Sequence, residues 1–177
     1  MLEKKEVFNH HTQAIYVMQK HFGSNPFSGI EIGTAEGLLT KGLLNLCPNL
    51  TMIYAIDPYT FNPGNGFESG MYDQAWHDDR RNQAVKALEP YPGRYTHLCA
   101  TSDDAVSMTP SEVDFVWIDG DHSSSQIIKD VKNYYPKVKT GGIFGGHDWD
   151  KAIRIVLETI PEVVMIGKDL TWWVIKD

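Results

Sequence analysis

The feature that most constrains the fold is a regular alternation between short apolar runs and longer segments with helical periodicity. Strands that alternate with helices form a parallel sheet covered on both faces and joined by right-handed crossovers. The last two apolar runs lie close enough along the chain to form an antiparallel pair. The sequence therefore predicts an α/β fold, a doubly wound and mostly parallel sheet with an N-terminal helix. Strands are expected at residues 29–32, 50–57, 94–99, 113–119, 141–148, 163–167 and 171–175, and helices at 6–22, 38–46, 74–88, 100–108, 123–138 and 150–160.

Composition narrows the class of protein. The 177 residues are 42% hydrophobic, which fits one domain over residues 1–177. The formal charge of -7 offers no broad positive field for nucleic acid. No apolar run approaches the ~20 residues needed to span a bilayer, and the N-terminal segment lacks signal-peptide features. Cys47 and Cys99 are expected as small buried side chains in a reducing compartment. A cytoplasmic enzyme or binding domain, with no membrane or nucleic-acid partner, is the prediction.

The first loop, Gly33 to Gly37, follows the first strand, at the edge where doubly wound sheets bind ligands. Glycine there allows positive φ and close approach of the backbone to a ligand. Ala35 stands where a dinucleotide-binding loop needs its second glycine. Acids at positions 31 and 36 would repel phosphates. The loop therefore favours binding of a positively charged ligand without phosphate, such as S-adenosylmethionine. The alternative interpretation is a glycine-bearing turn with solvated acids.

Two further acids stand at strand ends. Asp57 closes the second strand, where a carboxylate can accept hydrogen bonds from both ribose hydroxyls, and the alternative is a turn-forming acid before Pro58. Asp103 follows the third strand, where an adenine amino group would lie, and the alternative is a cap for the helix it begins. Residues 58–73, rich in glycine, proline and aromatic side chains, are the candidate substrate loop.

Acids and histidines end the next two strands. Asp119 and His122 follow the fourth strand, and His147 and Asp148 follow the fifth. Because neighbouring parallel strands lie about 4.8 Å apart, these loops can converge on one site. Such a group suits general acid–base catalysis or a hard divalent ion such as Mg²⁺. The alternative is that Asp119 caps the following turn and His147 packs against Trp149.

The chain resembles the class I S-adenosylmethionine-dependent methyltransferases, and most closely the branch grouped as methyltransferase family 24. The segments EIGTAEG, AIDPY, DFVWIDGDHSSSQIIKDV and KTGGIFGGHDW carry the resemblance. It implies a seven-stranded sheet with the last strand antiparallel. It also implies binding of S-adenosylmethionine: Glu31, Gly33, Thr34 and Gly37 around the methionine part, Asp57 at the ribose, Ser102 and Asp103 near adenine, and Asp119 beside the sulfonium.

The resemblance further implies a Mg²⁺ site at Asp119 and Asp148, as in some related enzymes, although His147 stands where some of those place a carboxylate. The chain lacks a large inserted lid, which leaves the substrate pocket open or completed by a second subunit of a homo-oligomer. The expected reaction is O-methylation of a small hydroxylated molecule, a sugar or a phenol. Either His147 or His122 would act as base, or a metal would lower the hydroxyl pKa. The rival hypotheses are an NAD(P)-dependent oxidoreductase and a nucleoside-binding domain without catalysis.

Overall fold

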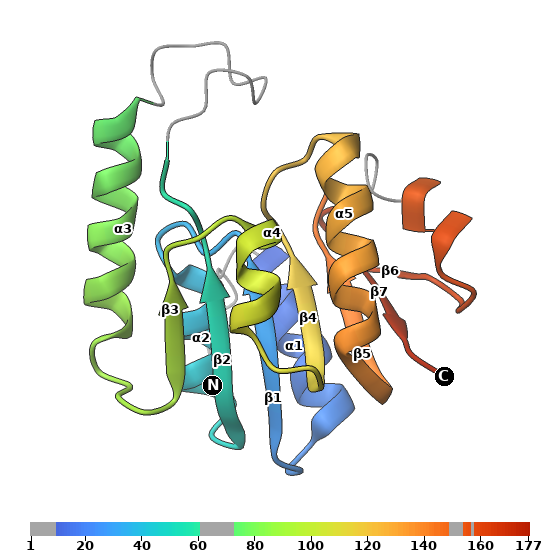
Figure 1. The fold of residues 1–177 in the computed structure, drawn as a ribbon. Helices are drawn as coiled ribbons and strands as arrows, with labels where there is room; N and C mark the ends of the chain where they lie inside the picture. The colour runs from blue at the N-terminus through green and yellow to red at the C-terminus, as the bar shows by residue number, and fades with distance from the viewer. Residues whose placement is uncertain (1–9, 61–72, 149–153, 157) are drawn as a thin grey trace.

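The sheet is seven-stranded, in the order β3-β2-β1-β4-β5-β7-β6 (Figure 1). The structure is a computed structural model that describes residues 10–60, 73–148, 154–156 and 158–177. The strands are β1 (Phe27–Ile32), β2 (Leu50–Ile56), β3 (Tyr95–Leu98), β4 (Val113–Ile118), β5 (Val138–Gly146), β6 (Met165–Ile166) and β7 (Trp172–Ile175). The five strands β1 to β5 pair in parallel, whereas β7 pairs antiparallel with both β5 and β6. The predicted fold class is confirmed.

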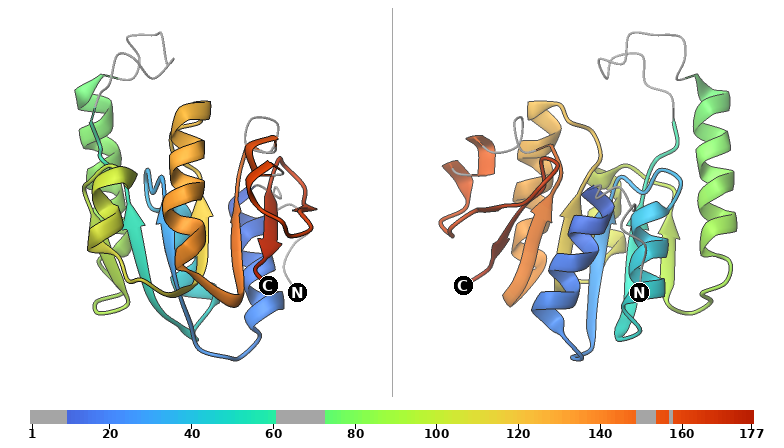
Figure 2. Two further views of the ribbon diagram at one scale, coloured as in Figure 1. Left: turned by 45° about the vertical axis from the view of Figure 1, so that its right-hand side comes forward. Right: turned by 180° about the vertical axis from the view of Figure 1, so that it is seen from behind.

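Helices cover both faces of the sheet, as two views from different sides show (Figure 2). One buried cluster joins β1 and β4 to α1 (His10–Phe22), α2 (Leu38–Leu46) and the end of α3 (Gln74–Leu88). The other joins the opposite face to α4 (Ser102–Ala105) and α5 (Ser124–Tyr134), with the 3₁₀ turns η1 (Val106–Met108) and η2 (Tyr135–Lys137) next to these helices in the chain. Among the described helices, none is long and apolar enough to cross a membrane.

Several element boundaries differ from the prediction for local reasons. The helix predicted to reach residue 138 ends at Tyr134, because Pro136 has no backbone N–H and the chain continues as a 3₁₀ turn. Strand β5 consequently begins at Val138 rather than at residue 141. Of the helix expected at 150–160, residues 154–156 and 158–159 are helical, and its start lies outside the described residues.

Burial confirms some sequence-based expectations and corrects others. The neighbouring Trp172 and Trp173 alternate across β7, so that Trp172 is buried and Trp173 is partly exposed. Cys47 is buried as expected. Cys99 is exposed, so its assignment as a buried thiol was wrong, because it follows the last residue of β3 at the edge of the sheet. The candidate substrate loop falls largely on residues 61–72, which lie outside the described residues, and Tyr59 at its start is buried.

Candidate active site

The order of the strands reverses between β1 and β4, and in doubly wound sheets ligands bind at such a point, outside the carboxyl ends of the strands. Gly33 leaves β1 with a φ of 91°, and a Cβ added there would lie 2.1 Å from the Asp119 carbonyl oxygen. The backbone N–H of Asp119 donates to the Ile32 carbonyl at 2.7 Å. The first loop and the β4 loop are therefore in direct contact, and glycine is required at position 33 by both space and φ.

The first loop is held to the end of β2 by Asp57. Its carboxylate accepts from the Ala35 N–H at 2.9 Å and from the Tyr59 N–H at 2.9 Å. The Tyr59 hydroxyl donates to the Ala35 carbonyl at 2.8 Å and lies 3.0 Å from His97 Nε2 of β3. Asp57 stands where a ribose site was predicted, and it also shapes the first loop, which has a φ of 44° at Ala35.

The acids of the first loop are less available than their sequence positions suggested. The Glu31 side chain is 2% exposed and accepts a hydrogen bond from the buried Thr40 hydroxyl. Burial raises the pKa of Glu31 to about 8, and the charges of Asp119 and Asp57 add to that rise. Glu36 forms an ion pair with Arg80 of α3. The acidic character expected of this loop is therefore largely neutralised, because Glu31 is buried and Glu36 is paired with a cation.

The predicted adenine edge lies at the start of α4. Ser102 is 8% exposed, and the Asp103 side chain is 40% exposed with a carboxylate oxygen 2.7 Å from Lys129 Nζ. Thr101 caps the helix by accepting from the Asp104 N–H. The alternative interpretation of Asp103 as the cap was therefore wrong, and its carboxylate stands at the surface of this edge.

The acids and histidines of the β4 and β5 loops meet, as predicted. His122 Nδ1 lies 2.8 Å from an Asp148 carboxylate oxygen. His147 Nδ1 lies 3.5 Å from Asp119 Oδ1 and 3.4 Å from Asp148 Oδ1. The backbone N–H of His147 donates to the Ile118 carbonyl, and the Trp172 indole donates to the backbone carbonyl of His147. These two bonds hold the end of β5 against its neighbours. All four side chains are partly exposed, as a site open to a substrate requires.

Two properties of this cluster bear on chemistry. Burial alone would lower the pKa of His147, but a hydrogen bond to Asp119 and the charges of Asp119 and Asp148 outweigh it, so the pKa is raised. Ligand atoms of Asp119, His122 and Asp148 lie within 4.8 Å of one another. Two carboxylates and one imidazole fit a divalent ion such as Mn²⁺ or Mg²⁺, with the imidazole favouring Mn²⁺. The sequence had predicted the two acids of this set, and the structure adds His122.

Sequence reasoning missed the side chains that support these loops. Thr40 and His97 carried no recognisable signal, because each acts through a contact between two different elements of the fold. Tyr59 was placed in a substrate loop, although an aromatic residue two positions after Asp57 could have indicated a packed turn. Arg80 stacks over Trp76 at 4.6 Å, four residues earlier on α3, and that spacing was visible in the sequence.

The chain matches a family model described as a methyltransferase domain over residues 30–149. No curated protein matches it in sequence. The O-methyltransferase NovP has a similar structure, with a TM-score of 0.68 and 16% identity over 94% of this chain and 81% of that one. An O-methyltransferase from Bacillus cereus in complex with SAH gives 0.63 and 14%, over 99% and 84%. The spermidine synthase from Thermotoga maritima gives 0.64 and 15%, over 98% and 60%. These likenesses show the fold.

Proposed function

The chain belongs to methyltransferase family 24, a group of class I S-adenosylmethionine-dependent methyltransferases, and from this premise we propose that it O-methylates a hydroxyl group of a small molecule. The observation that carries the proposal is the cluster of Asp119, His122, His147 and Asp148 beside the first loop. A sulfonium already makes its methyl group electrophilic, so such a cluster serves to prepare a weak nucleophile. Amines would need less help than hydroxyls. The nicotinamide-dependent alternative is not favoured, since the matching family is one of methyltransferases.

The cofactor would lie along the carboxyl ends of β1, β2 and β3. The first loop, including Gly33, Thr34 and Gly37, would face the methionine part. Glu31 would lie behind this loop, buried within β1. Asp57 would accept the ribose hydroxyls with the lone pairs that its two backbone donors leave unused. Asp103 would face adenine. In this pose the sulfonium would lie near Asp119, where the first loop touches the loop after β4.

His147 is the proposed base. The oxygen of the acceptor attacks the methyl carbon, the carbon–sulfur bond breaks, S-adenosylhomocysteine leaves, and the hydroxyl proton passes to neutral His147. Asp119 and Asp148 face His147 and stabilise the imidazolium that forms. Because those carboxylates also raise the pKa of His147, the neutral form is populated above the ordinary histidine range.

As the alternative to a histidine base, Asp119, His122 and Asp148 would hold a divalent ion, and their donor set fits one. Such an ion, when bound, would polarise the acceptor hydroxyl and lower its pKa. The substrate class would then be sugars or phenols with a chelating pair of oxygens. The acceptor pocket would be open or completed by a second copy of the chain. The molar mass of the protein in solution distinguishes a monomer from a homo-oligomer.

Calorimetry and electron paramagnetic resonance test the proposal together. We expect S-adenosylhomocysteine to bind, and one Mn²⁺ to bind with an affinity that Asp148→Asn weakens at least about tenfold. The control Asp79→Asn, an exposed acid on α3, should leave Mn²⁺ binding unchanged. Absence of heat with S-adenosylhomocysteine would refute cofactor binding. Equal Mn²⁺ binding by wild type and Asp148→Asn would refute the metal site alone.

A further inference from the structure

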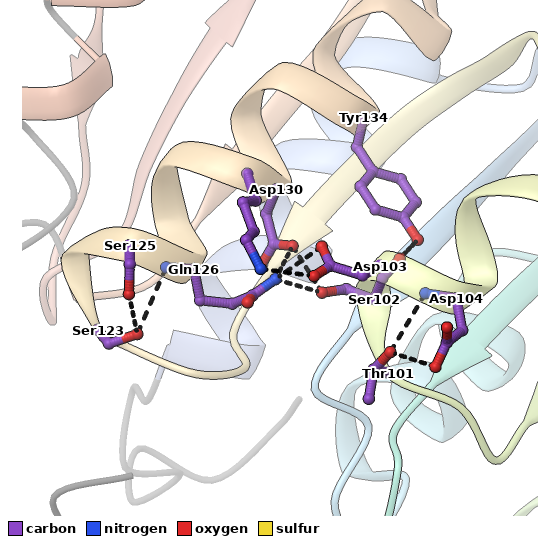
Figure 3. A network of polar contacts seen from close by, with 10 residues as sticks. Thr101, Ser102, Asp103, Asp104, Ser123, Ser125, Gln126, Asp130 and Tyr134 are labelled. Carbon is purple, nitrogen blue, oxygen red and sulfur yellow. Dashed lines mark hydrogen bonds and ion pairs between the residues drawn. The ribbon is translucent and has the colours of Figure 1, made fainter. Parts of the chain in front are cut away.

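Three side chains on one face of α5 converge on a single residue of the predicted adenine edge (Figure 3). Gln126, Asp130 and Tyr134 are spaced four residues apart, which places them on the same side of the helix. The Ser102 hydroxyl donates to Asp130 Oδ1 at 2.6 Å and accepts from Gln126 Nε2 at 2.9 Å. The Tyr134 hydroxyl donates to the Ser102 carbonyl at 2.6 Å. Both polar ends of Ser102 are therefore bonded to α5.

The contacts that Asp130 and Tyr134 make with Ser102 are buried. Asp130 and Tyr134 are 0% exposed, and Ser102 is 8% exposed. Among the described residues, none forms a hydrogen bond with the second carboxylate oxygen of Asp130, and burial raises the pKa of Asp130 to about 6. A buried carboxylate is a costly way to attach one helix to another, because an apolar contact would avoid its desolvation. The cost indicates a role in placing Ser102 and its neighbours.

The neighbour that matters is Asp103. Its carboxylate lies 2.7 Å from Lys129 Nζ and 3.3 Å from Gln126 Nε2, so two residues of α5 orient it directly. The hydrogen bond to Lys129 is the main reason that the pKa of Asp103 is lowered, and the carboxylate is therefore ionised at neutral pH. Because it is also exposed, Asp103 can accept a hydrogen bond from a ligand, whereas Ser102 is fully engaged within the protein.

We propose that Gln126, Asp130 and Tyr134 are positioning residues that fix Asp103 as an acceptor for the exocyclic amino group of adenine, and so set selectivity for adenine. The inference rests on the proposed function, since it assumes that the cofactor's base lies at this edge. A base with a carbonyl oxygen in place of that amino group would turn an acceptor toward the Asp103 carboxylate, and the two would repel each other. Gln126 contributes most, because it contacts Ser102, Asp103 and Asp130 with one amide nitrogen.

The test compares S-adenosylhomocysteine with S-inosylhomocysteine, which carries a carbonyl at that position, by calorimetry. The wild type should bind the adenosyl compound at least about tenfold more tightly, as expected for a hydrogen bond to a charged group. Gln126→Ala should reduce that ratio severalfold. Tyr134→Phe should reduce it by a smaller factor. The matched control is Tyr135→Phe, which removes the same atom from the adjacent residue, where the hydroxyl bonds Glu162 instead.

The ratio of the two affinities separates positioning from stability. A general loosening of the fold would weaken both ligands by the same factor, and thermal unfolding of each variant measures that loosening independently. The proposal is overturned if the variants change both affinities equally or neither, or if Tyr135→Phe lowers the ratio as much as Tyr134→Phe does. It is also overturned if the wild type binds both ligands equally. Failure of the wild type to bind either ligand would instead refute the proposed function, which is a distinguishable result.

Discussion

Replacement of Glu31 by glutamine should remove a pH-dependent loss of stability. Glu31 lies within β1 with a side chain that is 2% exposed, and its carboxyl group bonds the Thr40 hydroxyl. Burial raises its pKa from the ordinary 4.5 to about 8. The folded protein therefore binds this proton more tightly than the unfolded chain does. The resulting stabilisation is fully present below pH 4.5 and is lost as the pH rises through 8.

The magnitude follows from the size of that shift. Each pH unit between the two pKa values costs about 1.4 kcal/mol of unfolding free energy. Between about pH 5.5 and pH 7.5 the wild type should therefore lose about 2.5 kcal/mol through Glu31 alone. A glutamine side chain has the same shape as glutamate and no titrating proton, so the Glu31→Gln variant should lack this part of the pH dependence. Other titrating groups, such as Asp130, act on both proteins and cancel in the difference.

Urea unfolding of the wild type and Glu31→Gln at these two pH values measures the effect. The difference in unfolding free energy should shift in favour of the variant by about 2.5 kcal/mol at the higher pH. A parallel pH dependence of the two proteins would show that Glu31 ionises normally and that its burial does not hold in solution. Thr40→Val serves as a control, since it removes the hydrogen bond but leaves the titrating carboxyl in place.

Three further outcomes are expected. Gly33→Ala should lower the unfolding free energy by about 3 kcal/mol or more in urea, because the new Cβ would meet the Asp119 carbonyl at a strained φ, and an unchanged midpoint would contradict this contact. A thiol reagent should label the exposed Cys99 and spare the buried Cys47, and S-adenosylhomocysteine should slow the labelling if it covers the end of β3; labelling at the same rate would argue against that pose. The rate of methyl transfer should rise with pH with a midpoint above 6.5, as neutral His147 forms, and Asp148→Asn should move the midpoint down; a rate independent of pH would exclude histidine as the base.

The fold was predictable because its signals are local. Each strand before a helix is a short apolar run, and each loop at the functional edge contains a glycine or an acid in the expected place. Helix α3 begins at Gln74 and ends at Leu88, as its pattern indicated, because Asp73 caps its first turn. Predicted boundaries were wrong where a single residue ended an element before its periodic pattern did, as Pro136 did at the end of α5. Membership of a methyltransferase family was likewise readable from segments that are contiguous in the chain.

The electrostatics of the first loop were not predictable from the sequence. Glu31 and Glu36 were interpreted as exposed charges that would favour a cationic ligand. One is buried against Thr40, and the other is paired with Arg80, which lies more than forty residues away on α3. A sequence states how many charges a loop carries, but solvent exposure and partners decide how much of that charge a ligand meets. The role of Asp57 at the ribose stays a prediction, and its carboxylate lies just after the end of β2.

The α5 contacts show how such tertiary information could still be sought in a sequence. Gln126, Asp130 and Tyr134 interrupt the apolar face of an amphipathic helix at intervals of four residues. Buried polar side chains require partners, so the buried Asp130 and Tyr134, with the partly buried Gln126 beside them, indicate a polar partner outside the helix. Ser102 is that partner, and the sequence could not identify it because the hydrogen bonds join positions 24 to 32 residues apart. A polar stripe on an otherwise buried face predicts that a contact exists, and the packing of helices α4 and α5 determines which residue makes it.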